Sequence, residues 1–191
     1  MKRVLLPLGV AGLVLSGCSG SDASEPAVSP SSPSSAAPSP SATEEAVTLG
    51  PGSFTFETPS GATGTLEVPG APDPGIESMR VEVGAPEVTY LTGSFDNREG
   101  SEEFLINSAT VYDANGNAYE YARAKDYVFD LLPDTADPKY NEFVTFYESV
   151  GSSKVAPLER ADFVLVGPEL PAEIAGVNVS DGYEMYGAAP L

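Results

Sequence analysis

The feature that most limits the fold of this chain is a repeated alternation of apolar and polar residues. Phe54 and Phe56 alternate with small or charged neighbours, and Leu66 and Val68 do the same after the turn signal at residues 59–61. In a β-strand, successive side chains point to opposite faces of the sheet. A period of two therefore predicts strands that have one buried face and one solvated face.

The same pattern recurs along the rest of residues 47–191. Further strands are expected at residues 79–83, 88–95, 104–112, 118–121, 163–166 and 176–180. Turn residues separate these runs, and no alternation of strands with helices links them. The sequence therefore predicts an all-β domain over residues 47–191, built as an antiparallel β-sandwich.

The segment of residues 113–117, Asp-Ala-Asn-Gly-Asn, separates two of the expected strands. Asn-Gly between two strand-like runs predicts a β-hairpin, because both residues tolerate the positive φ of a tight turn. Oxygen side chains at alternate positions are also typical of calcium loops. An EF-hand needs a glutamate at position twelve, however, and that position counted from Asp113 is Ala124. The hairpin is the preferred interpretation, and a weak calcium site at Asp113 is the alternative.

One stretch departs from the period of two. Asp137-Pro138 is typical of a helix N-cap followed by proline at the first helical position, and apolar residues then recur at helical spacing as far as Gly151. This pattern predicts a helix of about three turns inserted in the β domain and lying across an end or an edge of a sheet. Residues 126–132 are expected to add another short helical turn.

Aromatic residues cover more of this helix than one narrow stripe. The preferred interpretation is that the four aromatic side chains, Tyr140, Phe143, Phe146 and Tyr147, pack in the core. The alternative is an exposed aromatic patch for a partner, in which Tyr140, Phe146 and Tyr147 are the candidate interaction surface and Phe143 is a core residue.

The N-terminus resembles a targeting signal. Lys2 and Arg3 precede an apolar run at residues 4–15, which is the layout of a secretory signal and is shorter than the run of about 20 residues that a membrane span needs. The Leu-Ser-Gly-Cys motif that ends at Cys18 resembles the bacterial lipobox, in which the cysteine is diacylated and the chain is cut just before it. This resemblance implies a signal peptide at residues 1–17, and it implies a protein held on the outer face of the cell membrane by its N-terminal lipid.

Residues 18–46 contain almost only Ser, Ala and Pro after the lipidation site. A segment so poor in large apolar side chains cannot bury enough surface to offset the entropy lost on ordering. We expect a disordered tether whose reach as a flexible coil is roughly 30 Å.

Composition excludes several classes of function. The chain has no histidine and one cysteine, so it lacks the usual general base and cannot form an internal disulfide. Its formal net charge is -19, and cleavage before Cys18 removes Lys2 and Arg3, which changes the charge to -21. A surface of this sign repels phosphate backbones, so nucleic acid is not expected as a partner. We predict no cofactor, no metal and no catalytic residue.

Four acidic residues, Asp96, Glu99, Glu102 and Glu103, fall in one polar segment between strands. Paired carboxylates hydrolyse glycosidic bonds where a pocket raises the pKa of one of them. A solvated charged loop is the preferred interpretation of this segment. The alternative is a carboxylate-based hydrolase that acts on cell-wall polymer.

Two segments carry a family resemblance. Residues 90–97 (YLTGSFDN) followed by residues 111–119 (VYDANGNAY) resemble a pattern of secreted immunoglobulin-like domains in Gram-positive and actinobacterial lipoproteins, which are related to immunogenic secreted antigens of mycobacteria. Residues 155–157 and 163–166 are similar to the later proline turn and apolar strand of that group. The resemblance covers about residues 79–179 and implies an immunoglobulin-like sandwich without established catalytic residues. Residues 125–153 form an insertion relative to the pattern.

Together these features favour a non-enzymatic binding or interaction module at the cell envelope. Its expected partners are the membrane, through the lipid, and an envelope protein or polymer that the sequence does not identify.

Overall fold

The computed structural model describes residues 48–191. The predicted signal peptide at residues 1–17, the lipidation site Cys18 and the predicted tether at residues 18–46 lie outside the described residues. Between residues 48 and 191, no helix combines the length and the apolar character needed to cross a membrane.

The described residues contain ten strands and three helices. The strands are β1 (Gly52–Glu57), β2 (Thr63–Val68), β3 (Thr89–Asp96), β4 (Phe104–Leu105), β5 (Ser108–Tyr112), β6 (Ala118–Arg123), β7 (Lys154–Val155), β8 (Arg160–Gly167), β9 (Gly176–Ser180) and β10 (Met185–Pro190). The helices are α1 (Pro74–Glu82), α2 (Ala124–Asp130) and α3 (Tyr140–Ser149).

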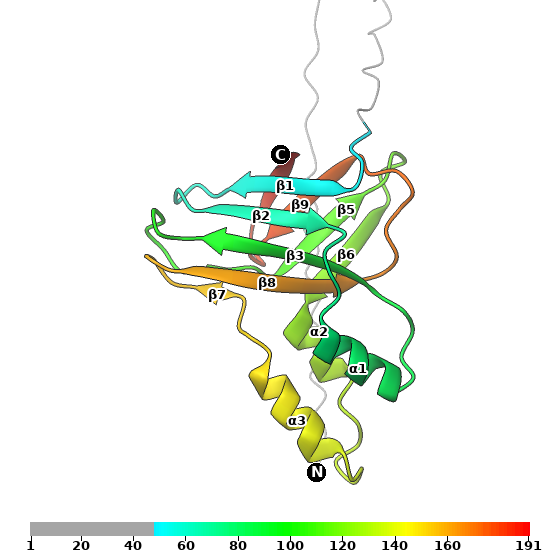
Figure 1. The fold of residues 1–191 in the computed structure, drawn as a ribbon. Coiled ribbons are helices and arrows are strands. Elements are labelled where there is room, and N and C mark those ends of the chain that lie inside the picture. Colours follow the sequence, from blue (N-terminus) through cyan, green and yellow to red (C-terminus); the bar gives the residue numbers. More distant parts are fainter. Residues whose placement is uncertain (1–47) are drawn as a thin grey trace, which may run out of the picture. The chain divides into compact units, whose positions relative to one another are not determined.

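Eight of the strands close into an antiparallel barrel (Figure 1). The strand order around the barrel is β1-β10-β9-β5-β6-β8-β3-β2, and the short strands β4 and β7 pair with each other separately. The predicted immunoglobulin-like β-sandwich is therefore wrong, because the main sheet closes on itself.

Strand β8 explains the closure. It pairs with β3 along its whole length, from Arg160 to Gly167, and its Leu165 and Val166 also pair with β6. It thus joins two groups of strands that would belong to separate sheets in a sandwich. Alternating side chains face one dry interior in either architecture, so the sequence pattern does not distinguish them.

The barrel interior is a packed core. Inward-facing residues of seven strands are at most 1% exposed, among them Phe54, Leu66, Leu91, Val111, Tyr121, Leu165 and Val179. Gly64 and Gly93 occupy positions where an aromatic ring takes the place of a side chain. A Cβ atom at Gly64 would overlap the Phe56 ring, and one at Gly93 would overlap the Thr65 carbonyl oxygen of β2 and lie 2.5 Å from the Phe163 ring. These glycines let the strands coil closely around the aromatic core.

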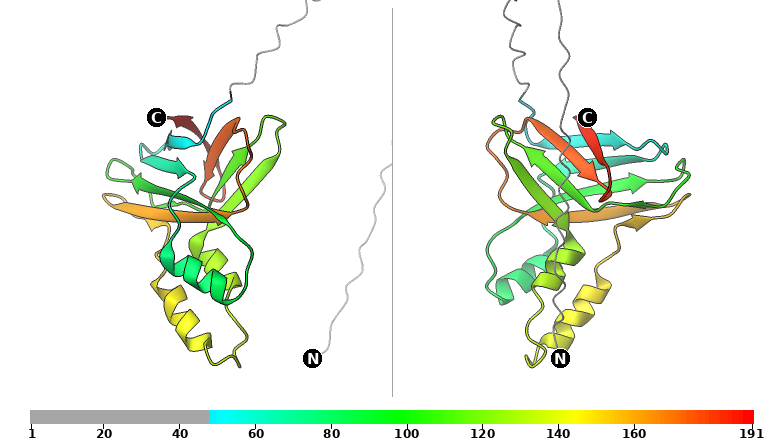
Figure 2. Two further views of the ribbon diagram at one scale, coloured as in Figure 1. Left: turned by 45° about the vertical axis from the view of Figure 1, so that its right-hand side comes forward. Right: turned by 180° about the vertical axis from the view of Figure 1, so that it is seen from behind.

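The three helices lie together on one side of the barrel (Figure 2). They form a second core, which contains Ile76, Phe143 and Val128 and rests on the outer face of β3 and β8. Both strands are therefore buried on two faces. In β8, Leu165 points into the barrel and Val166 contacts the helices, which accounts for the continuous apolar run at residues 163–166.

Helix α1 shows that the strand predicted at residues 79–83 is wrong. The Asp73 carboxylate accepts hydrogen bonds from the N–H groups of Gly75 and Ile76 at 2.9 and 3.0 Å, and Pro74 stands in the first helical turn. This is the Asp-Pro start signal that we recognised only in the later helix. An N-cap of this kind outweighs a short alternation of apolar residues.

The predicted later helix is confirmed as α3, with a later start. Asp137 does not cap the helix directly, since its carboxylate accepts a hydrogen bond from Lys139 N–H at 2.8 Å in the preceding turn. The helix begins at Tyr140 with Lys139 at the N-cap. The short turn expected at residues 126–132 is also confirmed, as helix α2, which begins and ends two residues earlier.

Two strands differ from the prediction. The strand expected at residues 104–112 is interrupted, so that β4 pairs with β7 and β5 enters the barrel. Strand β10 was not predicted. Asp181-Gly182 before it is a hairpin signal of the same kind as Asn115-Gly116, and β10 pairs with β9 across that turn.

The hairpin predicted at residues 113–117 is confirmed, and β5 and β6 pair in antiparallel register on either side of it. Gly116 is the only residue of this turn with a positive φ, +81°. Its N–H donates to the Asp113 carbonyl at 3.0 Å. This geometry is a type I turn followed by a left-handed glycine, which makes a three-residue loop.

Replacing Gly116 with valine is expected to destabilise the domain by about 1–3 kcal/mol, because a β-branched residue resists positive φ. Crowding does not contribute, since no atom lies within 4 Å of the position that a Cβ would take. Gly116→Asn is the matched control, because asparagine tolerates the left-handed region. Thermal unfolding of both variants measures the effect, and equal midpoints would contradict the assigned turn.

Candidate functional site

The Asp113 carboxylate belongs to the hairpin turn. It accepts hydrogen bonds from the N–H groups of Asn115 and Asn117 at 2.8 Å and from the Asn117 amide at 2.7 Å. The Asn117 side chain, followed by these backbone groups, holds the pKa of Asp113 below its ordinary value. Within residues 48–191, no group of three or more acidic or cysteine side chains is placed to hold a metal ion.

The predicted acidic segment does not act as one unit. Asp96 is paired with Arg98, whose side-chain hydrogen bonds lower the pKa of Asp96 to about 2. Glu103 is paired with Lys154 at 2.6 Å. Glu102 and Glu103 border one hollow, and Asp96 borders a different one.

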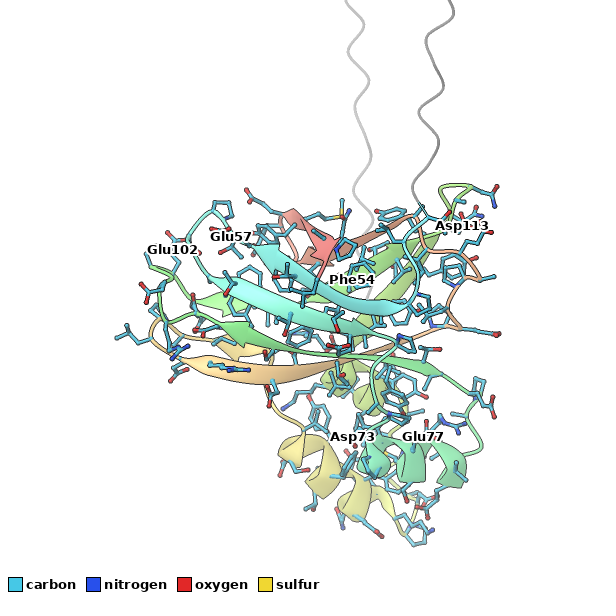
Figure 3. The ribbon with its side chains drawn as sticks, turned by 45° about the horizontal axis from the view of Figure 1, so that its top comes forward. Phe54, Glu57, Asp73, Glu77, Glu102 and Asp113 are labelled. Atoms are coloured by element: carbon cyan, nitrogen blue, oxygen red, sulfur yellow. The ribbon has the colours of Figure 1, made fainter. Side chains whose placement is uncertain are left out.

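This hollow lies at one end of the barrel and has a volume of 380 Å³. Figure 3 shows Glu102 at this end, together with Glu57 at the end of β1. The other lining residues come from the β1–β2 turn, from β4 and from the start of β10 with the turn before it (Thr58, Pro59, Ser60, Phe104, Asp181, Tyr183, Glu184 and Tyr186). The fold therefore adds Asp181 and Glu184, which we did not predict, to two acids of the predicted segment.

Aromatic rings form the inner wall of the hollow. Phe104 stacks on Phe95 with ring centroids 4.3 Å apart and lies 5.5 Å from the ring of Tyr186. Tyr183 also lines the hollow and is 97% exposed. The hollow thus combines carboxylates with aromatic faces, one of which is fully accessible.

Asp181 is held as an anion by its surroundings. Its carboxylate accepts hydrogen bonds from Tyr183 N–H, Glu184 N–H and the Tyr186 hydroxyl at 2.8, 2.7 and 2.8 Å. Burial alone would raise the pKa of Asp181, yet these donors hold it below its ordinary value. Burial and the neighbouring Asp181 carboxylate raise the pKa of Tyr186.

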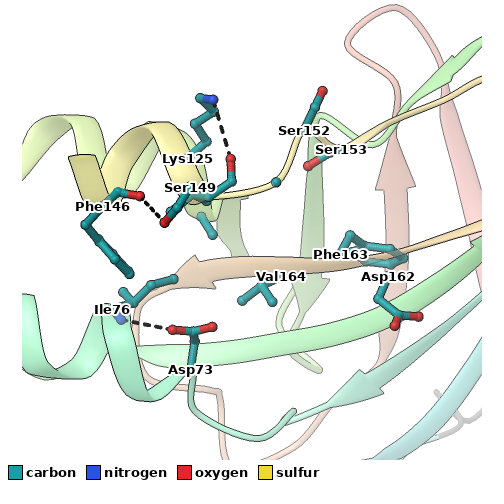
Figure 4. Close-up of a pocket in the computed structure, with 13 residues that line it drawn as sticks. Asp73, Ile76, Lys125, Phe146, Ser149, Ser152, Ser153, Asp162, Phe163 and Val164 are labelled. Carbon is teal, nitrogen blue, oxygen red and sulfur yellow. Dashed lines mark hydrogen bonds between the residues drawn. The ribbon is translucent and has the colours of Figure 1, made fainter. Parts of the chain in front are cut away.

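A second hollow, of 260 Å³, lies between the helices and the barrel (Figure 4). Ile76, Phe146 and Val164 contribute its apolar wall. The polar groups near the helices already have partners within the protein. Asp73 caps α1, Ser149 donates to the Phe146 carbonyl at 2.6 Å, and Lys125 Nζ donates to the Val150 carbonyl at 3.4 Å.

The three residues of the candidate interaction surface are all half-buried. Phe146 faces α1, where its ring lies 2.5 Å from the position of a Cβ on Gly75. Tyr147 faces α2 and packs against Phe129. Tyr140 lies two turns before Tyr147 on the same face of α3. The structure thus directs Phe146 toward the helix core and leaves Tyr147 at its margin.

We call Phe129, Tyr147 and Lys125 the aromatic ledge. Phe129 is 58% exposed, and its ring centroid lies 5.8 Å from that of Tyr147. Lys125 Nζ lies 4.9 Å from the centroid of the Tyr147 ring, within the range of a cation–π interaction. We did not predict Phe129 or Lys125 as site residues. The sequence signal that could have found Phe129 was the spacing of Ala124 and Val128. These two residues are four apart and form the buried face of α2, and Phe129 lies next to that face.

A polar network attaches α1 to the barrel. The Tyr90 hydroxyl on β3 donates to the Glu77 carboxylate at 2.9 Å, and Arg80 forms an ion pair with Glu77 at 2.8 Å. Arg80 also donates to the Ala85 carbonyl at 2.8 Å. Arg80, with help from Tyr90, lowers the pKa of Glu77. These groups satisfy one another, so we assign the network a structural role.

Comparison of the chain with models of protein families, with curated proteins and with solved structures found no match.

Proposed function

We propose that this protein is a lipid-anchored lipoprotein on the outer face of the cell membrane, and that its barrel domain binds a protein or polymer of the envelope without catalysing a reaction. The observation that carries the proposal is the aromatic ledge. An exposed phenylalanine that packs against a half-buried tyrosine leaves apolar surface in water, and binding of a partner buries this surface. Tyr147 is the central contact, Phe129 extends it, and Tyr140 and Phe146 support the same helix.

The position of the helices is consistent with this role. In Figure 1 the described chain begins beside β1, on the side of the barrel that lies away from α3. Residue 48, where the preceding chain joins the domain, therefore lies away from the helices that carry the ledge.

The charge of the domain restricts the partner. Without Lys2 and Arg3, seven of the nine basic residues remain in residues 48–191, and without the acids at positions 22, 25, 44 and 45, 24 of the 28 acidic residues remain. Five of the seven basic side chains are already in ion pairs (Arg80, Arg98, Arg123, Lys139 and Lys154). Such a surface favours a neutral or basic partner over a polyanion.

A carboxylate-based hydrolase has less support. The hollow at the barrel end does bring four carboxylates together, but Glu103 is paired with Lys154. The pKa of Asp181 is lowered, whereas a general acid needs a raised pKa. Binding is the function that this geometry favours.

The proposal is tested by recovery of the partner from envelope extracts. The full chain, carrying an affinity tag, is crosslinked in intact cells, and the enriched proteins and polymer fragments are quantified by mass spectrometry. The double variant Phe129→Ala/Tyr147→Ala is expected to reduce recovery at least about tenfold, because truncation of central aromatic residues removes most of the binding energy of an interface. Its unfolding midpoint should change little, because both side chains retain exposure to solvent.

Val81→Ala is the matched control, since Val81 is 64% exposed on α1 and lies outside the ledge. This variant should recover the partner as well as the unmodified protein does. Equal recovery with the ledge variant and the unmodified protein would contradict the proposal, as would an equal loss with the ledge variant and the control.

A further inference from the structure

Two seams of the barrel are paired over only two positions each, β6–β8 and β1–β10. At the β1–β10 seam, the second paired position joins Thr55 to Ala189. The same register would place Glu57 opposite Gly187, but the strands do not pair there. They separate toward the end of the barrel that holds the 380 Å³ hollow lined by Glu102, Asp181 and Glu184, which we call the acidic hollow.

Backbone groups on both strands point into this opening. Across the paired part of the seam, Leu191 N–H donates to the Ser53 carbonyl at 2.9 Å. The direction of backbone hydrogen bonds alternates along an antiparallel strand, so Met185 and Gly187 on β10 and Glu57 on β1 also direct their N–H and C=O groups toward the seam.

These three residues are exposed, and no backbone hydrogen bond joins them across the seam within residues 48–191. Unpaired strand edges of this kind accept an added strand from another polypeptide.

The acidic hollow is continuous with these edges. It is lined by Thr58, which follows β1, and by Tyr186 on β10. A side chain from a strand laid along β10 would therefore have a 380 Å³ cavity beside it. Phe104 and Tyr186 present aromatic rings to the stem of such a side chain.

Charge decides which side chains fit. Glu102, Asp181 and Glu184 present carboxylates to the hollow, and Glu57 lies beside it. A lysine or arginine can pack its apolar stem on the aromatic wall and place its charged group among the carboxylates. The exposed ring of Tyr183 offers a cation–π contact at the entrance.

We propose that the open seam binds an extended segment of a partner protein that carries lysine or arginine at alternate positions. The segment adds a strand to the free edge of β10, and its basic side chains enter the hollow. Backbone hydrogen bonds supply affinity, and the carboxylates select the charge. This site is separate from the aromatic ledge, so either can fail without the other.

The probe for this proposal is a fluorescent nine-residue peptide that alternates lysine and valine, measured by anisotropy against the full chain in mild detergent. A second peptide replaces each lysine with glutamine, and a third is N-methylated at every second residue to remove backbone donors along one edge. The lysine peptide is expected to bind at least about tenfold more tightly than either. Its affinity should also fall as salt rises.

Variants locate the site. Glu102→Gln/Glu184→Gln should weaken binding of the lysine peptide at least about tenfold, since each carboxylate contributes a charge-assisted contact. Glu87→Gln/Glu169→Gln, which removes two exposed acids outside the hollow, should change the affinity less than about twofold. At saturation, amide hydrogen exchange at Met185 or Gly187 should slow at least about tenfold.

The proposal fails if the lysine peptide does not bind at millimolar concentration. It also fails if the N-methylated peptide binds as tightly as the lysine peptide, which would indicate attraction by charge alone. Equal weakening by the two pairs of variants would show that the whole acidic surface, and not the hollow, attracts the peptide.

Discussion

Replacing Cys18 with serine is expected to abolish membrane anchoring, so that the protein appears in the medium or remains as unprocessed precursor. Cys18 is the only cysteine of the chain, and a serine hydroxyl cannot form the thioether that holds the lipid. Two acyl chains give stable attachment, whereas a single chain gives only marginal binding. Loss of the lipid should therefore change the location of nearly all of the protein.

Detergent-phase partitioning and the mass of the mature N-terminus measure this effect. Ser19→Ala is the matched control, because it changes the neighbouring residue and leaves the thiol in place. The control should remain processed and in the detergent phase. A processed Cys18→Ser protein that still enters the detergent phase would contradict the lipobox interpretation.

Replacing Phe95 with alanine is expected to lower the free energy of unfolding by about 3–5 kcal/mol. Phe95 is fully buried in the barrel, and its ring lies between those of Phe56 and Phe104, with centroids 5.8 and 4.3 Å away. The aromatic stack cannot collapse easily around the cavity, because three different strands, β1, β3 and β4, hold its members in place. Domains of this size have a total stability of about 5–15 kcal/mol, so the variant should unfold at a much lower denaturant concentration.

Chemical denaturation followed by tyrosine fluorescence measures this loss. Phe129→Ala is the matched control, because it makes the same chemical change at a ring that is 58% exposed. It should cost less than about 1 kcal/mol. Similar losses in the two variants would contradict the packing assigned to the barrel interior.

The local pattern of the chain determined several elements correctly. Strands β1 and β2, the hairpin between β5 and β6, and helix α3 all follow from signals that lie within the element itself. Alternation sets the face of a strand, Asn115-Gly116 supplies a residue suited to positive φ, and helical spacing positions Phe143 in a core. The targeting signal around Cys18 is also local, and it stays a prediction because it lies outside the described residues.

Helix α1 shows where local signals compete. Met79, Val81 and Val83 alternate as a strand would, yet Asp73 and Pro74 start a helix just before them. Two backbone hydrogen bonds to Asp73 and the packing of Met79 in the second core favour the helix. In the helix, Val81 is 64% exposed. In a strand with one buried face, Val81 would have been buried together with Met79 and Val83.

Only the tertiary structure decided between a sandwich and a barrel, and only it assembled the candidate sites. Closure depends on the pairing of β8 with both β3 and β6, strands that are far apart in the chain and carry no local mark of their neighbours. The acidic hollow likewise joins the turn after β1, the segment after β3 and the turn before β10. A side-chain pattern indicates which face of a strand is buried. It does not state which strand lies beside it, because pairing is set by backbone groups that are the same in nearly every residue.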